Sequence, residues 1–249
     1  MFKKFYKWLI KLASLRNFYF FAGRLIPWFG WSTLILMVVG LYWGLVEAPT
    51  DYQQKDSYRI IFIHVPAAWM SLFVYMMMAI SAAASLIWKT KASEVFANSC
   101  APLGAMFTFL ALATGSLWGK PMWGTYWEWD ARLTSELVLL FLFLGYIALQ
   151  SAFEDKRTAA RATAILAIVG VVNIPIIHYS VEWWFTLHQG ATVAKFDKPS
   201  MDISMLIPLL IMATAFKTYF FTTVLMRSRN EILERESHSN WVTEEKERL

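Results

Sequence analysis

The chain has 249 residues, of which 57% are hydrophobic and 16% are charged, whereas about a quarter of the residues in soluble domains are charged. With a mean hydropathy of +0.43 and 13 tryptophans, this composition argues against a soluble globular protein and favours one embedded in lipid. The net charge of +5 does not indicate a nucleic-acid partner, because basic residues in a membrane protein first reflect its topology. The single cysteine excludes an internal disulfide.

Residues 1–26 are predicted to form a basic amphipathic segment. Six lysines and arginines are interspersed there with large apolar residues, a pattern typical of a segment that lies on an anionic membrane surface. We do not expect a cleaved signal peptide, because charges interrupt the apolar stretch and no small-residue cleavage site follows it.

Six apolar stretches follow, each meeting or approaching the roughly 20 residues that are needed to cross about 30 Å of hydrocarbon. The predicted membrane spans are residues 27–46, 60–88, 101–118, 133–151, 162–179 and 201–221. We expect Pro27 to stand near the start of the first helix, where proline is tolerated, and Pro175 to kink the fifth.

Lysine and arginine are concentrated in the segments that face the cytoplasm if the N-terminus does. Sixteen of the 23 fall in the inner segments 1–26, 89–100, 152–161 and from 222 onward, and six fall in the outer segments 47–59, 119–132 and 180–200. By the positive-inside rule, we predict an all-α membrane protein with six transmembrane helices and both termini in the cytoplasm. The six-span membrane domain, residues 27–226, is then followed by a short charged cytoplasmic tail, residues 227–249.

The most unusual segment, residues 118–134, is an outer loop between the third and fourth spans. Its aromatic residues are Trp118, Trp123, Tyr126, Trp127 and Trp129. An interface belt needs only one or two aromatic residues at a helix end, so this density favours a binding platform for a large, flat, apolar ligand with a polar edge. For any single tryptophan, a place in the interface belt is the alternative.

Histidines lie on both sides of this segment in the sequence. His64 falls near the outer end of the second span, which is longer than the hydrocarbon requires, so we expect it at headgroup level on a helical extension. His178 and His188 come at and after the outer end of the fifth span. We expect His178 to bond to a neighbouring helix, although intramembrane ionisable groups are often functional. His238 is expected to be solvated in the tail.

Charged residues near the tryptophans have two kinds of explanation. Asp130 precedes the fourth span and is predicted to cap that helix, with Glu136 near its positive end. Arg59, Lys120 and Arg132 are candidates for holding the carboxylates of a ligand, because guanidinium groups grip carboxylates in a bidentate fork. For Lys120, contact with lipid phosphate is an equal alternative.

Three segments together resemble a known family. Residues 118–134 are similar to the tryptophan-rich WWD signature of haem-handling proteins in cytochrome c maturation. With residues 58–68 and 173–184, they resemble the CcmC family of haem exporter proteins. The six spans and the short length agree with this family, while Tyr126 stands where many members have tryptophan. The resemblance implies that His64 and His188 are axial ligands of haem iron, and that Arg59 and Arg132 help to hold the haem.

The same resemblance implies a place and partners. It predicts a multi-pass protein of the bacterial inner membrane, with the WWD loop in the periplasm, that binds haem b and delivers it to the haem chaperone CcmE. It also implies association with the ABC-type ATPase CcmA, the permease CcmB and the small single-span protein CcmD. We expect a transport and delivery protein and not an enzyme. Residues 115–121 are one residue short of a phosphate-binding loop and lack its Ser/Thr, so we expect any ATP dependence to come from a partner.

Two other functions are alternatives for a membrane protein of this kind. A haem lyase would attach haem to apocytochrome thiols, as larger proteins of this superfamily do, but the chain lacks their extra spans and any large outer domain. A permease for a non-haem solute would carry polar or charged residues in the middle of its spans. Few occur here, and the unusual residues gather at the outer surface.

Overall fold

The computed structural model describes residues 13–188, 190, 193 and 198–247, and the regular structure within that part of the chain is helical. The long helices are α2 (Leu15–Tyr42), α3 (Ile61–Trp88), α4 (Lys91–Trp123), α5 (Ala131–Ser151), α6 (Lys156–Val169), α7 (Asn173–Trp183) and α8 (Ile203–Arg235). A short helix, α9 (Asn240–Lys246), ends the described chain. A π-helical turn, Trp43–Glu47, extends α2, and a 3-10 turn, Asp56–Ile60, precedes α3.

Six helical segments among the described residues are long and apolar enough to cross a membrane. They are Leu15–Glu47, Asp56–Trp88, Lys91–Trp123, Ala131–Ser151, Lys156–Trp183 and Ile203–Arg235. Each contains one of the six predicted spans, apart from the first two residues of the last one, so the predicted all-α, six-span fold is confirmed. The orientation of the two ends relative to the membrane stays a prediction.

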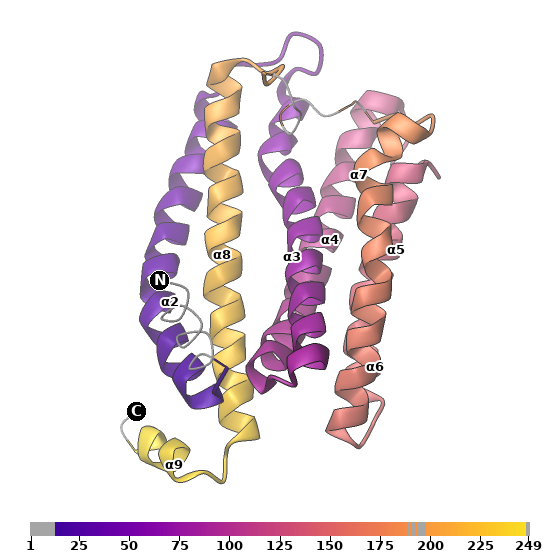
Figure 1. Cartoon of the computed structure of the whole chain (residues 1–249). Helices are drawn as coiled ribbons and strands as arrows, with labels where there is room; N and C mark the ends of the chain where they lie inside the picture. The colour runs from indigo at the N-terminus through magenta and orange to yellow at the C-terminus, as the bar shows by residue number, and fades with distance from the viewer. Residues whose placement is uncertain (1–12, 189, 191–192, 194–197, 248–249) are drawn as a thin grey trace.

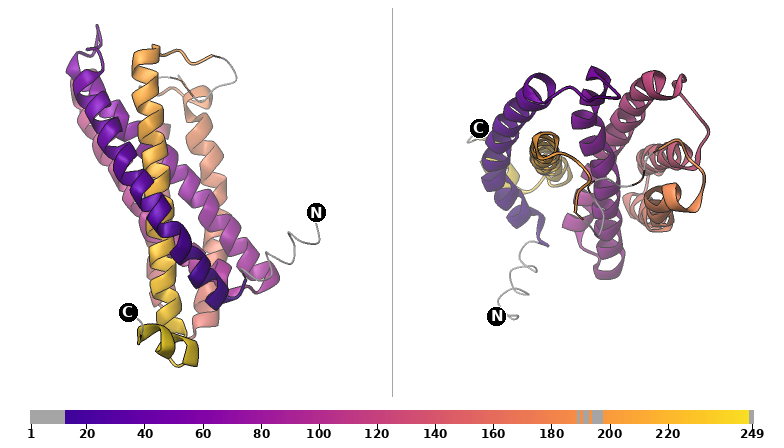
Figure 2. Two further views of the ribbon diagram at one scale, coloured as in Figure 1. Left: turned by 90° about the vertical axis from the view of Figure 1, so that its left-hand side faces the viewer. Right: turned by 90° about the horizontal axis from the view of Figure 1, so that it is seen from above.

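The helices form an elongated bundle with α3 and α4 in its middle (Figures 1 and 2). The most extensive contacts are those of α3 with α4 and of α2 with α8. The α2–α8 pair covers one side of this centre, and α5, α6 and α7 cover the other. Of the six spans, α4 is the most buried. Its last turns lie at the end of the bundle where α3 begins and α7 ends, because they contact His64 at the start of α3 and His188 after α7.

The first helix begins at Leu15, so Pro27 lies well inside it and the expectation that Pro27 stands near a helix start is wrong. The residues before Pro27 are already apolar enough to continue the helix, and a proline inside a membrane helix is tolerated. Residues 1–12 lie outside the described residues. The amphipathic segment predicted for 1–26 stays a prediction, and its part from Leu15 onward belongs to α2.

The fifth span is broken, as its proline predicts. Helix α6 ends at Val169, the residues Gly170–Val172 form a 3-10 turn, and α7 begins at Asn173. Pro175 has no N–H to donate to the carbonyl of Val171, and its ring crowds that carbonyl. The disturbance therefore appears about one turn before the proline itself.

Residues 227–247 are more helical than a charged tail suggests. Helix α8 continues to Arg235, and α9 then folds back onto the start of α2, where the Trp241 ring centre lies 5.4 Å from that of Tyr19. Arg235 is paired on α8 with Glu231 and across to Glu94 of α4, at 2.7 Å in both cases. Paired charges can extend a helix beyond its apolar part, which the hydropathy of the sequence does not reveal.

Candidate functional site

The tryptophan-rich segment is more helical than predicted. Helix α4 continues through Trp118 as far as Trp123 and ends at Gly124, whose φ of 79° provides the left-handed C-cap. Only residues 124–130 connect α4 to α5, whereas the sequence suggests a longer outer loop within 118–134. Trp118 and Trp123 are thereby fixed on the last turns of the most buried helix.

His64 lies in the first turn of α3 with its ring against α4. Its Nδ1 is 3.0 Å from the carbonyl oxygen of Ala111 and 3.1 Å from Oγ1 of Thr114. Because a carbonyl oxygen can only accept, Nδ1 carries the hydrogen, and Nε2 of the neutral ring keeps its lone pair. The Trp118 ring meets the imidazole edge-on, with their centres 5.7 Å apart.

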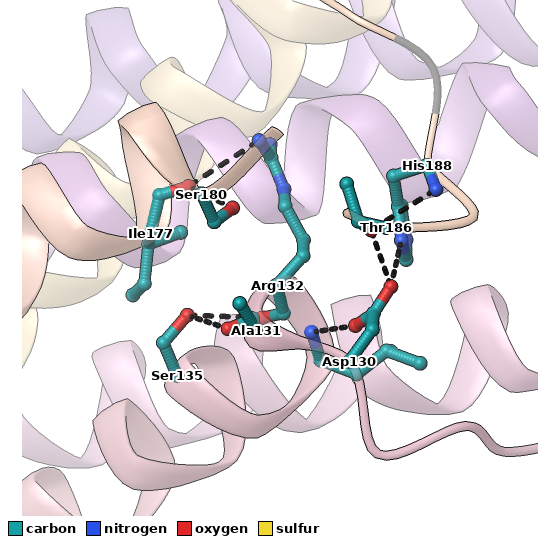
Figure 3. A network of polar contacts seen from close by, with 9 residues as sticks. Asp130, Ala131, Arg132, Ser135, Ile177, Ser180, Thr186 and His188 are labelled. Atoms are coloured by element: carbon teal, nitrogen blue, oxygen red, sulfur yellow. Dashed lines mark hydrogen bonds and ion pairs between the residues drawn. The ribbon is translucent and has the colours of Figure 1, made fainter. Parts of the chain in front are cut away.

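His188 is held by a second set of bonds, from the connection that follows α7 to the start of α5 (Figure 3). Its Nδ1 lies 3.2 Å from Oδ2 of Asp130, and its backbone N–H donates to Oγ1 of Thr186 at 3.1 Å. The Thr186 hydroxyl donates to the same Oδ2. The Trp123 ring centre is 4.8 Å from that of His188.

Asp130 also caps α5, as predicted, because its Oδ1 accepts from the Leu133 N–H at 2.8 Å (Figure 3). Burial raises the pKa of Asp130, but the hydrogen bonds from Thr186, Leu133 and His188 outweigh it and hold the pKa below 3.8. Burial lowers the pKa of His188 below 6.5, against the opposing effect of Asp130. At neutral pH, therefore, the carboxylate is charged and the imidazole neutral, so that Nδ1–H donates to Asp130 and Nε2 is free to bind a metal.

The two histidines lie near one another. Each contacts a tryptophan at the end of α4, His64 at Trp118 and His188 at Trp123. They are also within electrostatic range of each other and of Arg132. The structure thus brings together two predicted imidazoles, two predicted tryptophans and one predicted arginine.

Arg132 is poorly satisfied for a guanidinium group with five donors. Its Nη1 donates to the carbonyl oxygen of Ile177 at the long distance of 3.4 Å (Figure 3). No carboxylate of the described residues lies within ion-pair distance of it. The nearby Glu136 is buried and instead accepts a hydrogen bond from Ser71 of α3 at 2.6 Å. Arg132 is therefore available to an anionic ligand.

The remaining arginine and lysine candidates lie in other contacts. Arg59 is bound to Asp56 and to the carbonyl oxygen of Gly44, each at 3.1 Å, which ties it to the end of the first span. Lys120 donates to the carbonyl oxygen of Gly124 at 2.9 Å. The structure does not bring these two side chains into contact with either histidine.

The other two tryptophans contact each other, with ring centres 5.4 Å apart. Trp129 is 75% exposed, whereas the Trp127 Nε1 is buried and has no hydrogen-bond partner among the described residues. A buried donor without an acceptor is costly, so this N–H is a candidate contact for a bound ligand.

The expectation for His178 is wrong. Its side chain is exposed, its ring packs against Tyr179 with centres 4.7 Å apart, and no hydrogen bond to a neighbouring helix forms among the described residues.

Three further residues of the site are not indicated by the sequence pattern. Thr114 and Thr186 hold the two histidines, and the Oε1 of Gln54 accepts a hydrogen bond from the Trp118 indole at 2.9 Å.

Comparison with known proteins gives one consistent match. The family model described as Heme exporter protein C, CcmC, matches residues 8–243. Heme exporter protein C of Haemophilus influenzae is 50% identical over 95% of this chain and 96% of its own length. The proteins of the same name from Escherichia coli K12 and Bradyrhizobium diazoefficiens are both 52% identical, over 96% and 93% of this chain and 96% and 88% of their own lengths.

Proposed function

The chain belongs to the Heme exporter protein C family, and from this premise we propose that it presents haem b on the outer side of the inner membrane and delivers it to the chaperone CcmE. It is a multi-pass membrane protein that handles haem in cytochrome c biogenesis. Haem is here the cargo of the protein, and the residues at the end of α4 are proposed to hold it during transfer.

The state of the two histidines supports this proposal most. In both rings Nδ1 donates a hydrogen bond within the protein, which leaves Nε2 as a lone-pair donor. Haem iron accepts two axial imidazoles, one on each face. We therefore assign His64 and His188 as the axial ligands.

The surrounding side chains fit a flat ligand with two carboxylates. Trp118 and Trp123 each contact one of the histidines and offer aromatic faces and edges to a porphyrin. Arg132 has unused donors and is the first choice for a propionate. Arg59 would have to leave Asp56 to take the same role, so we place it second. Trp127 and Trp129 complete the proposed platform as its outer rim.

The location and partners are part of the proposal. The bias of lysine and arginine toward the other end of the bundle supports a periplasmic site. The name of the family, that of a haem exporter, supports an assembly with the ATPase CcmA, the permease CcmB and the single-span protein CcmD. Delivery, and not covalent attachment of haem, is the role that we assign to this chain.

The proposal is tested with the purified full chain in detergent. Bound haem gives a Soret absorption band, and His64→Ala and His188→Ala should each reduce it strongly. His178→Ala and His238→Ala are matched controls that should retain it, since neither contacts the described site. Wild-type haem content in both the His64 and His188 variants would overturn the ligand assignment.

A further inference from the structure

The two proposed ligands differ in what holds them. The Nδ1 of His64 donates to a neutral acceptor, the carbonyl oxygen of Ala111 on the neighbouring helix. The Nδ1 of His188 faces the Asp130 carboxylate, which is only 8% exposed. His64 belongs to a helix, whereas His188 lies in the irregular connection between α7 and α8. The position of His188 therefore depends more on its side-chain bonds.

The hydrogen bonds that hold His188 link three residues, Asp130, Thr186 and His188, in a closed cycle (Figure 3). Thr186 accepts from the backbone of His188 and donates to Asp130, while the His188 ring reaches the same carboxylate oxygen. The other carboxylate oxygen is fixed on the first turn of α5 by the Leu133 N–H. Both the backbone and the ring of His188 are thus tied to one rigid helix end.

We propose that Asp130 is a positioning residue that sets the Nδ1–H tautomer and ring orientation of His188, and that this makes His188 the stronger of the two haem ligands. The inference rests on the haem function proposed above. A histidine ligand that donates its second N–H to a carboxylate is fixed in orientation and becomes more basic, so it binds the metal more tightly. His64 donates to a carbonyl oxygen, which raises the basicity of its ring less than a carboxylate does. It therefore binds iron less tightly and is the ligand that releases iron first when haem is passed on.

The tautomer can be measured without haem. The full chain has four histidines, and nitrogen-15 NMR of labelled histidine distinguishes Nδ1–H from Nε2–H rings. We expect His188 to be Nδ1–H in the wild type and to shift toward Nε2–H in Asp130→Asn, because the Asn amide can donate toward Nδ1. Asn also remains a good helix cap, so the start of α5 is preserved. An unchanged tautomer in Asp130→Asn would overturn the positioning role.

The strength of the ligand is measured separately. In His188→Gly loaded with haem, added imidazole can replace the lost side chain and donate to Asp130, whereas 1-methylimidazole has no second N–H. We expect imidazole to bind at least about tenfold tighter than 1-methylimidazole, after correction for their affinities for free haem. This ratio should fall to near one in the double variant with Asp130→Asn. If the ratio of the two affinities were the same in His188→Gly and in the double variant, the proposed hydrogen bond would be refuted.

A third measurement avoids the glycine variant, should it fail to fold. In the haem-loaded protein with His188 intact, Asp130→Asn should raise the reduction potential, because a less basic ligand stabilises ferric iron less. An unchanged potential would contradict the inference. If the wild type bound no haem, the proposed function would fail, while the NMR result would still decide whether Asp130 positions His188.

Discussion

Gly115 of α4 lies directly against the ring of His64. A Cβ atom at this position would stand 2.9 Å from Cε1 of the imidazole and 3.4 Å from its Nδ1. The same Nδ1 is bonded to Ala111 and Thr114 of α4. The helix therefore fixes this ring from one side by hydrogen bonds and leaves room for it only because residue 115 has no side chain.

The substitution Gly115→Ala should displace His64 and weaken haem binding by roughly tenfold, or about 1.4 kcal/mol. The added methyl group must push the imidazole away from its hydrogen bonds to α4. Titration of the purified protein with haem, followed by the Soret band, measures the change. Gly145→Ala is the matched control, because its Cβ would stand 3.6 Å from Cδ2 of Leu166, an ordinary contact. Wild-type affinity in Gly115→Ala would argue against His64 as a ligand.

Arg132→Ala should weaken haem binding by about 1.5–3 kcal/mol, the range for hydrogen bonds to charged groups. The haem affinity of Arg132→Lys should lie between those of Arg132→Ala and the wild type. Lysine keeps the positive charge but cannot bind a carboxylate with two parallel N–H groups as arginine does. The decisive comparison uses haem dimethyl ester, whose propionates carry no charge. The wild type should prefer haem to the ester, and Arg132→Ala should lose that preference.

Arg59→Ala provides the parallel variant for that comparison. Arg59 is already bound to Asp56 and to the Gly44 carbonyl oxygen, so its loss should change the preference for haem over the ester less. If Arg132→Ala weakened binding of haem and ester equally, the propionate contact would be wrongly assigned and Arg132 would act in another way.

The helices and the residues of the site differ in how far the sequence predicts them. Hydropathy over some 20 residues identifies a span whatever its neighbours are, which is why all six spans can be predicted. Helix ends depend instead on local partners. Trp118–Trp123 continue α4 although the sequence predicts a loop there, and Arg235 ends a helix that hydropathy alone would stop near residue 221.

The candidate site, like the helices, can be predicted only in part from the sequence. That His64 and His188 lie close to Trp118 and Trp123 could be expected from the sequence, because their residue types and their order in the chain resemble a known pattern. The second role of Asp130 escapes prediction, since a cap is a local feature whereas its bond to His188 joins residues 58 positions apart. Arg59 and Arg132 look alike in the sequence, yet Arg132 acts electrostatically on both histidines, whereas Arg59 is bound to Asp56 and to the Gly44 carbonyl oxygen.

Arg235→Gln should destabilise the opposite end of the bundle by roughly 1–3 kcal/mol, since it leaves the carboxylates of Glu94 and Glu231 close together without their cation. The double variant with Glu94→Gln should recover part of this loss. Thermal unfolding in detergent, followed by circular dichroism, measures both changes. Haem affinity of the folded protein serves as the internal control and should not change. A double variant no more stable than Arg235→Gln would show that the pair with Glu94 adds nothing.

Gly170→Ala should destabilise the break in the fifth span by about 1–3 kcal/mol, the usual cost of overpacking. A Cβ there would stand 1.9 Å from the Tyr75 hydroxyl oxygen and 3.0 Å from Cδ1 of Leu142. That hydroxyl is buried without a hydrogen-bond partner among the described residues, so Tyr75→Phe alone should cost little. Removing the hydroxyl should also relieve part of the clash, and the double variant should lose less than Gly170→Ala. Thermal unfolding of the three variants, with Gly145→Ala as the helical control, gives the coupling between the two sites. If the two effects were strictly additive, the cost of the added methyl group would not depend on the Tyr75 hydroxyl. The 3-10 turn would then shift away from α3 when a side chain is added, and Tyr75 would not be the reason for a glycine at this position.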